Sequence, residues 1–146
     1  MQLQPAIQAF DAPSGIASIF SRNNPLPRDG ASKRILVVED ELLLADDVAE
    51  AIQAMGFEPV GPVGTLEAAI ALAETQHLDG ALLDVRLRRG QRVYPVVEIL
   101  WRRRIPFCFM TAYSDQQIED MPAEAVLRKP VAPKVLQQAV LALIED

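Results

Sequence analysis

Acidic, hydroxyl and ammonium side chains stand at or near the ends of short apolar segments of this chain. In chain order they are Glu39, Asp40, Asp84, Thr111 and Lys129. These groups suit phosphoryl transfer, because acids hold a hard divalent cation, one carboxylate attacks phosphorus, and the hydroxyl and ammonium groups bind phosphoryl oxygens. They act together only if a fold brings positions 39 to 129 to one place. A parallel α/β sheet does this, since the carboxyl ends of its strands line one ligand-binding crevice.

Short apolar segments alternate with segments of helical periodicity from Lys33 to the C-terminus. This alternation predicts βαβ units, and hence an α/β fold with a five-stranded parallel sheet and helices on both of its faces. We expect strands at 33–38 and 58–62, a third ending at 84, and two more at 106–110 and 124–128. We expect helices at 41–55, from 65, at 92–104 and from 133.

Glycine, threonine and proline residues mark where the expected helices begin and end. Gly56 stops the first helix, and Thr65 is placed as the N-cap of the second. Pro95 is tolerable only in the first turn of the third helix, where its missing N–H is not needed. Pro133 begins the last helix.

Four short motifs, in this order and on the expected strands, resemble the receiver domains of two-component response regulators. They are Val38-Glu39-Asp40-Glu41 for the acidic pair, Leu83-Asp84-Val85 for the phosphorylated aspartate, Thr111-Ala112 for the switch hydroxyl, and Lys129-Pro130. The resemblance covers about residues 33–146. It implies a flavodoxin-like receiver (βα)5 fold and a function in phosphorelay signal transduction.

Asp84 is the predicted phosphoacceptor, and a cation is needed beside it to offset the charge of the incoming phosphoryl group. Asp40 would coordinate Mg²⁺ directly and Glu39 directly or through water, which suits a cation that keeps several waters. The resemblance adds the backbone carbonyl of Arg86 as a further ligand. For Asp40 taken alone, the alternative is a carboxylate that merely caps the next helix.

Lys129 is expected to bind a phosphoryl oxygen, and to pair with the carboxylates when no phosphoryl group is present. Without a counter-cation, three clustered acids would raise one another's pKa values and one would protonate. The resemblance implies a cis peptide bond between Lys129 and Pro130, which can fix where the amine points. Thr111 would donate its hydroxyl to the phosphoryl group; the alternative is a β-branched strand-end residue without a further task.

Two positions depart from the pattern that is common in receivers. Val126 stands three positions before the lysine, where an aromatic switch residue is usual. Tyr113 could take over part of that role or shield the site from water, and residues 107–113 resemble the Phe-Ala-Thr-Gly-Tyr-like segment of a stand-alone receiver subgroup. Arg86 stands where small polar residues are commoner. We hypothesise that Arg86 and Tyr113 together set the lifetime of the aspartyl phosphate.

The segment between Thr111 and Lys129 is shorter than is usual in the receiver family. Ser114 begins a sequence of capping-box form, but Pro122 cuts the helical stretch off after about two turns. We therefore expect a short or fluctuating fourth helix.

Residues 1–32 differ in composition from the rest of the chain. They contain four prolines and two glycines without a sustained period, and their two acidic residues are balanced by two basic ones. We expect a mostly flexible N-terminal extension over 1–32 and a receiver domain over 33–146, with nothing left to form an output domain. Ile16, Ile19 and Phe20 have helical spacing, so a docking segment is the alternative to a mobile tail.

Composition limits the other classes of function. The net charge of −6 argues against nucleic-acid binding by the domain as a whole. No apolar stretch approaches the ~18 residues of a membrane span, and the N-terminus lacks the features of a signal peptide. Cys108 is the single cysteine, so no disulfide forms within one chain. These features predict a cytoplasmic protein without a membrane or nucleic-acid partner.

Three other features are assigned no role in the site. His77 follows a helix end and is expected to be a solvated loop residue. Arg102, Arg103 and Arg104 fall in the last turn of a helix, where cations suit the helix dipole, and are expected to form a solvated helix end. Cys108 is expected in the core.

The predicted function is that of a bacterial signalling switch rather than an enzyme in the ordinary sense. A histidine kinase or histidine phosphotransfer protein would phosphorylate Asp84, and the domain would catalyse only its own phosphorylation and dephosphorylation. Two states of the fold would then be distinguished by an unknown downstream protein, or the phosphoryl group would be passed on. A homodimer is left open.

Three alternatives belong to other classes. A phosphatase of the haloacid-dehalogenase type needs a second acid two residues after the nucleophile, where this chain has Arg86. A nucleotide-binding flavodoxin-like protein needs a glycine-rich phosphate loop after the first strand, and this chain has none. An interaction module that keeps the receiver fold but works without phosphate stays open, and metal-dependent labelling of Asp84 would separate it from the switch.

Overall fold

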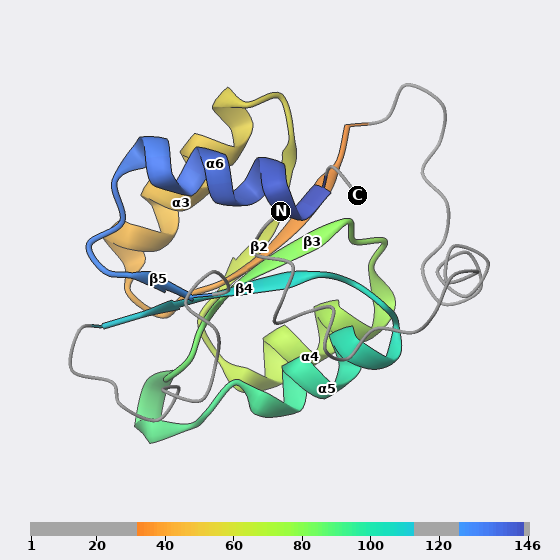
Figure 1. Ribbon diagram of the computed structural model, residues 1–146. Coiled ribbons are helices and arrows are strands. Elements are labelled where there is room, and N and C mark those ends of the chain that lie inside the picture. The colour runs from red at the N-terminus through yellow and green to blue at the C-terminus, as the bar shows by residue number, and fades with distance from the viewer. Residues whose placement is uncertain (1–31, 113–125, 145–146) are drawn as a thin grey trace.

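The computed structural model describes residues 32–112 and 126–144. Strands and helices alternate along the chain, as the sequence predicts (Figure 1). In order, the elements are β1 (Arg34–Val38), α3 (Leu42–Ala54), β2 (Glu58–Val63), α4 (Leu66–Thr75), β3 (Gly80–Asp84), the 3₁₀ turn η1 (Arg88–Gly90), α5 (Tyr94–Arg102), β4 (Phe107–Thr111), β5 (Val126–Arg128) and α6 (Pro133–Ile144). In the described part, each helix is too short or too polar to cross a bilayer.

The five strands form one sheet in the order β2-β1-β3-β4-β5, and each neighbouring pair is parallel. At the carboxyl edge of the sheet Val38 lies level with Leu83, and Thr111 lies level with Arg128. The ends of β1, β3, β4 and β5 therefore reach the same edge. The predicted α/β fold with a five-stranded parallel sheet is confirmed.

Helices cover both faces of this sheet. Figure 1 shows α3 and α6 on one face and α4 and α5 on the other. Successive side chains of a strand point to opposite faces. Ile35 and Leu82 therefore pack in the core beneath α3 and α6, whereas Leu36 and Leu83 pack in the core beneath α4 and α5. Because β1 and β3 are buried on both faces, nearly all their residues are apolar, without the alternation of apolar and polar residues seen in half-exposed strands.

Local sequence signals set the ends of the helices as expected. Gly56 follows α3 with φ +87°, in the left-handed region that favours glycine. Thr65 is the N-cap of α4, and its Oγ1 accepts a hydrogen bond from Ala68 N–H at 3.2 Å. Pro95 lies in the first turn of α5, and Pro133 begins α6.

Two side chains that were predicted to be solvated are instead largely buried. Arg103 is 7% exposed, and its guanidinium donates to the backbone carbonyls of Ala73 and Gln76 at the end of α4. It satisfies carbonyl groups that a helix end leaves unpaired, a contact that a run of three arginines does not reveal. His77 lies in a loop, as predicted, but its side chain is only 15% exposed and its Nε2 lies 3.5 Å from Asp79 Oδ2.

Three predictions fall outside the described residues: the N-terminal extension up to position 31, the short fourth helix, and the role of Tyr113. Within the described part, the helix predicted at 92–104 is shorter, because Val93 is its N-cap and Arg104, just beyond its end, has φ +64°. The strand β4 begins and ends one residue later than predicted.

Candidate functional site

The carboxylates of Glu39, Asp40 and Asp84 converge at the carboxyl edge of the sheet. Each offers one oxygen, and these oxygens all lie within 4.8 Å of one another. Glu39 and Asp40 follow β1, and Asp84 ends the neighbouring strand β3. Glu39 and Asp84 are buried, and Asp40 is half-buried. Parallel pairing of two strands thus joins acids that lie far apart in the sequence.

Lys129 supplies the positive charge that faces these acids. Its Nζ lies 2.9 Å from Glu39 Oε1 and donates a hydrogen bond to Asp84 Oδ2 at 3.2 Å. The backbone N–H of Lys129 donates to the carbonyl of Thr111 at 2.8 Å, which ties the end of β5 to the end of β4. The peptide bond from Lys129 to Pro130 is cis. The lysine therefore pairs with the carboxylates, as the sequence led us to expect for the site without a phosphoryl group.

Backbone hydrogen bonds hold the acids in position. The N–H of Glu39 donates to the carbonyl of Val63 at 2.8 Å, which links the loop after β1 to the end of β2. The N–H of Glu41 donates to Glu39 Oε2 at 3.0 Å, so the turn that begins α3 orients this carboxylate. Beside β3, the N–H of Arg86 makes a longer contact of 3.4 Å to Asp84 Oδ1. Glu39 and Asp84 therefore each have a main-chain N–H beside one carboxylate oxygen and Lys129 Nζ beside the other.

Burial and neighbouring charges shift the ionisation of Asp84. Its pKa is raised to about 7, first by burial and then by the charge of Glu39, against the opposing effect of Lys129. The pKa of Lys129 is raised as well: burial lowers it, but the close contact with the Glu39 carboxylate and the charge of Asp84 outweigh the burial. The site carries more negative charge than a single lysine offsets.

The donor set fits a hard divalent cation. Three carboxylate oxygens at short mutual distances are ligands of the kind that Mg²⁺ prefers. Glu39 Oε1 is buried without an aligned hydrogen-bond donor, and Lys129 meets it only as an ion pair. The pKa of Asp84 is raised first by burial and then by the charge of Glu39, and a divalent cation would offset that negative charge.

Of the remaining predicted site residues, Thr111 and Arg86 lie in the described part of the chain. Thr111 ends β4 with its side chain buried, and its Oγ1 donates to the carbonyl of Ala112 at 3.3 Å. Arg86 is exposed and stands two residues after Asp84. Val126, at the position of the usual aromatic residue, is half-buried at the start of β5.

Gly64 was not among the predicted site residues, yet it packs against the acidic pair. A Cβ atom at position 64 would lie 3.0 Å from Asp40 Cα and 3.4 Å from the carbonyl oxygen of Glu39. A side chain there would push on the backbone that carries both acids. The signal was present, because a glycine between a strand and the helix N-cap Thr65 marks a tight turn or a close backbone approach.

Comparison with known families agrees with this geometry. A model of the response regulator receiver domain matches residues 35–141. The chain belongs to this family. The matched region includes the acids Glu39, Asp40 and Asp84. It also includes Thr111 and Lys129. The protein is therefore a receiver-domain signalling protein of the two-component type.

The chain is similar to two curated bacterial regulators. It is 33% identical over 112 residues to the transcriptional regulatory protein PdtaR of Mycobacterium tuberculosis strain H37Rv, covering 74% of this chain and 55% of PdtaR. It is 30% identical over 103 residues to the phyllosphere-induced regulator PhyR of Methylorubrum extorquens, covering 68% of this chain and 39% of PhyR. The chain thus spans about half the length of these curated relatives, or less.

Solved receiver structures share its fold. The solution structure of SdrG from Sphingomonas melonis Fr1 has a TM-score of 0.66 at 39% identity, over 78% of this chain and 98% of that one. The solution structure of the PhyR receiver domain from Erythrobacter litoralis has a TM-score of 0.67 at 25% identity, over 77% and 90% of the two chains. Sequence and structure therefore point to the same family.

Proposed function

We propose that this receiver domain works in a phosphorelay, with Asp84 as its phosphoacceptor. The observation that carries the proposal is the convergence of three carboxylates within 4.8 Å of one another, with Lys129 Nζ 3.2 Å from Asp84 Oδ2. Glu39, Asp40 and Asp84 would hold Mg²⁺, together with the backbone carbonyl of Arg86. This set supplies a nucleophile, a cation site and an ammonium group in one place.

In the proposed reaction, a carboxylate oxygen of Asp84 bonds to phosphorus while the bond from phosphorus to the donor breaks and its electron pair leaves with the donor. Bound Mg²⁺ would offset charge on the phosphoryl oxygens. Lys129 would hold one phosphoryl oxygen, and Thr111 would hold another after its hydroxyl turns away from Ala112. Attack of water on the acyl phosphate would return the carboxylate and inorganic phosphate.

The donor and the output are part of the same proposal. We infer a histidine kinase or histidine phosphotransfer protein as donor, because the chain belongs to the receiver family. The signal would leave through contact with a downstream protein or through onward transfer. The similar protein SdrG has also been solved in a BeF3-activated conformation. The cytoplasm is the proposed location, with residues 1–32 as an extension and 33–146 as the receiver domain.

Arg86 and Tyr113 are proposed to set how long the phosphoryl group stays on Asp84. Arg86 is exposed beside the site, where its guanidinium is suited to phosphoryl oxygens. The double variant Arg86→Asn with Tyr113→Ala should change the rate of aspartyl-phosphate hydrolysis, followed by intact mass after the donor is removed. An unchanged rate would remove both residues from the proposal.

Intact mass after incubation with acetyl phosphate and Mg²⁺ tests the proposed function. The wild type should gain one phosphoryl group, and chelation of Mg²⁺ should abolish the gain. Asp84→Asn should gain none, whereas Asp46→Asn, which removes the same charge from an exposed part of α3, should be labelled like the wild type. Labelling of Asp84→Asn would show that another residue is the acceptor.

The alternative function is an interaction module that keeps the fold but works without phosphate. The half-buried Val126, in place of the usual switch aromatic, is the observation that favours it. Failure of both acetyl phosphate and a phosphorylated histidine kinase to label the wild type would support this alternative. Mg²⁺-dependent labelling by either donor would exclude it.

A further inference from the structure

The loop from β3 to α5 concentrates positive charge in an acidic protein. Residues 85–93 contain four arginines and no acidic residue: Arg86, Arg88, Arg89 and Arg92. Of the 14 lysines and arginines in the chain, this leaves ten elsewhere against 20 acidic residues. We call residues 86–92 the arginine loop. Its charge is opposite to that of the rest of the molecule.

The backbone of the arginine loop is pinned by hydrogen bonds. The N–H of Val93 donates to the carbonyl of Val85 at 3.0 Å, and the N–H of Leu87 donates to the carbonyl of Gln91 at 2.7 Å. The short turn η1 adds a bond from Gly90 N–H to the carbonyl of Leu87 at 3.2 Å. The loop is therefore an ordered turn that leaves the sheet at Asp84 and returns to the start of α5.

Buried apolar residues alternate with the arginines and set which way they face. Val85, Leu87 and Val93 are at most 3% exposed and belong to the core beneath α4 and α5. Arg88 and Arg89 are exposed. Because the apolar side chains anchor the loop, Arg88 and Arg89 are held at the surface, whereas Arg92 is half-buried.

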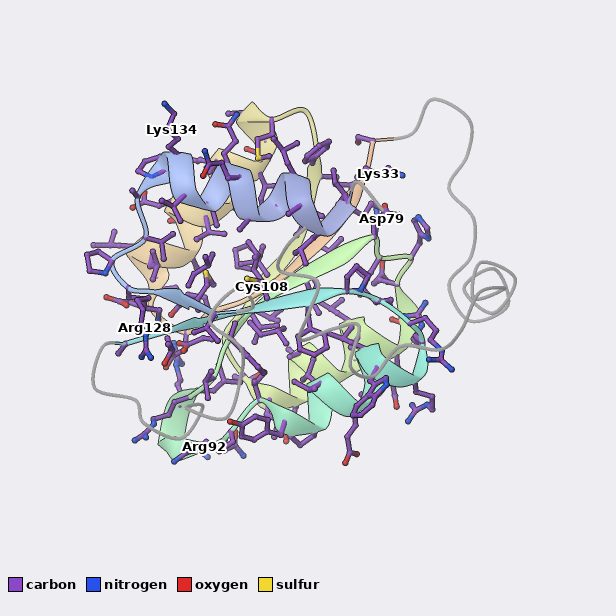
Figure 2. All side chains as sticks on the ribbon, in the orientation of Figure 1. Lys33, Asp79, Arg92, Cys108, Arg128 and Lys134 are labelled. Carbon is purple, nitrogen blue, oxygen red and sulfur yellow. The ribbon has the colours of Figure 1, made fainter. Side chains whose placement is uncertain are left out.

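The arginine loop borders the candidate phosphoacceptor site. It begins two residues after Asp84, and the N–H of Arg86 lies 3.4 Å from Asp84 Oδ1. Figure 2 labels Arg92 and Arg128 at the same end of the molecule, and Arg128 is the last residue of β5. The backbone of Arg92 also pairs with that of Arg86 in an isolated antiparallel bridge, so the end of the arginine loop returns to the residue beside the site.

The negative charge of the carboxylates opposes the approach of an anionic phosphodonor, and the arginine loop carries charge that could offset this repulsion. A small phosphodonor such as acetyl phosphate is a dianion near neutral pH, and the central carboxylates repel it. Guanidinium groups bind phosphate oxygens in a bidentate manner and stay charged at any pH of interest. Charge of one sign around a cleft raises the local concentration of an oppositely charged ligand and its rate of association, by about 10-fold or more.

We propose that the arginine loop is an anion-recruiting site that brings small, anionic phosphodonors of the acyl phosphate class to Asp84. Arg88, Arg89 and Arg92 form its rim, beyond the residues that hold the cation and the phosphoryl group. The proposal rests on the proposed function, and it adds a role in donor recruitment for residues outside the site itself. Acetate leaves with the electron pair of the broken P–O bond as the new bond to Asp84 forms.

The rate of Asp84 labelling by acetyl phosphate, at saturating Mg²⁺, tests the proposal. The variant carries Arg88→Gln, Arg89→Gln and Arg92→Gln. The matched control carries Lys33→Gln, Arg102→Gln and Arg104→Gln, which removes the same charge at the amino edge of the sheet. Figure 2 places Lys33 at the end of the molecule opposite Arg92. Each variant replaces one residue with positive φ, Arg89 or Arg104, so both variants are equally exposed to a disturbance of the backbone at such a position.

Varying the salt concentration and the charge of the donor distinguishes electrostatic attraction of the donor from a structural effect of the substitutions. At about 0.1 M salt, where the Debye length is about 10 Å, the loop variant should be labelled about tenfold more slowly than the control. At about 1 M salt, where that length is about 3 Å, the two rates should converge. Phosphoramidate, which carries less negative charge than acetyl phosphate, should show a smaller difference. Equal rates at low salt would overturn the proposal, and a difference that persists at high salt would mean a structural effect instead.

Binding of inorganic phosphate gives a readout that does not depend on labelling. In a titration followed by nuclear magnetic resonance, the backbone amides of residues 86–92 should shift in the wild type and in the control, but not in the loop variant. Absence of shifts in the wild type would refute the anion site even if Asp84 is labelled. Shifts without labelling of the wild type by either acetyl phosphate or a phosphorylated histidine kinase would keep the anion site and refute the proposed function.

Discussion

At the scale of single residues, burial decides how Asp84 and its partners behave. Asp84 is 6% exposed and Glu39 is 2% exposed, so both carboxylates have lost most of their water. Lys129 meets both of them, at 3.2 Å and 2.9 Å, and one ammonium group cannot offset two buried negative charges. Either a proton or a cation must supply the missing charge. When no cation is bound, a proton on Asp84 supplies this charge, and the pKa of Asp84 is raised accordingly.

The raised pKa of Asp84 predicts how stability without Mg²⁺ depends on pH. Below 3.8, Asp84 is protonated in the folded and the unfolded chain; between 3.8 and about 7, only the folded chain keeps the proton. The stabilising contribution of this proton is therefore lost as the pH rises through about 7. The free energy of unfolding of the wild type, minus that of Asp84→Asn, should fall across this range.

Urea unfolding followed by circular dichroism, in the presence of a chelator, measures this difference at each pH. Asp46→Asn, which removes an exposed acid of α3, controls for the change in net charge. A difference between wild type and Asp84→Asn that stays constant from pH 4 to pH 8 would contradict the burial argument.

At the scale of elements, the turn after β2 positions the acidic pair that follows β1. The register between β1 and β2 shifts between Leu36 and Val38, and Gly61 has φ +94° at this irregularity. The shift places the carbonyl of Val63 where it accepts the N–H of Glu39. The chain then leaves β2 through Gly64, in close contact with the backbone of Asp40. The position of the acidic pair thus depends on the edge strand β2 and the turn that follows it.

Gly64→Ala is predicted to weaken Mg²⁺ binding by about tenfold, which corresponds to about 1.4 kcal/mol. The new Cβ would lie 3.0 Å from Asp40 Cα, which is backbone and can give way only by moving both acids. Gly80→Ala is the matched control, because its Cβ would meet Ile35 Cδ1 at an ordinary 3.5 Å at the other end of β3. Isothermal titration calorimetry measures both affinities. Equal Mg²⁺ affinities of the two variants would mean that the turn at position 64 accommodates the new side chain without moving the acids.

At the scale of the whole molecule, the site lies at the carboxyl ends of two strands that border both cores. β1 and β3 carry the acids and contribute alternate residues to the cores on both faces of the sheet. A change in charge at the carboxyl ends of β1 and β3 therefore affects strands that pack against helices on both faces of the sheet. Any ligand that binds only the folded arrangement of Glu39, Asp40 and Asp84 must stabilise the entire domain.

Mg²⁺ is predicted to raise the stability of the folded chain. At a concentration one hundred times its dissociation constant, it should add about 2.7 kcal/mol to the free energy of unfolding. Thermal unfolding should show a higher Tm with Mg²⁺, and a chelator should reverse the rise. Asp40→Asn should abolish most of the effect, whereas Asp46→Asn should retain it. A wild-type Tm that does not change with Mg²⁺ would contradict the binding of Mg²⁺ by the three carboxylates.

The sequence by itself determined the strand and helix pattern and which residues stand at the strand ends. Apolar periodicity and the end signals Gly56, Thr65 and Pro133 are local, so they could be recognised without a structure. The alternation of strands and helices then implied a parallel sheet, and a parallel sheet places its carboxyl ends at one edge. This reasoning predicted the convergence of Asp40, Asp84 and their neighbours.

Only the tertiary structure decided the contacts that depend on how distant segments pack. The 2.9 Å contact of Lys129 with Glu39 arises because the ends of β1 and β5 reach one edge of the sheet. The close approach of Gly64 to Asp40 arises from the turn after an edge strand. Arg103 is buried because the end of α4 offers carbonyl groups beside the end of α5. No local pattern encodes these distances, because each joins segments that meet only after the sheet and its helical layers have assembled.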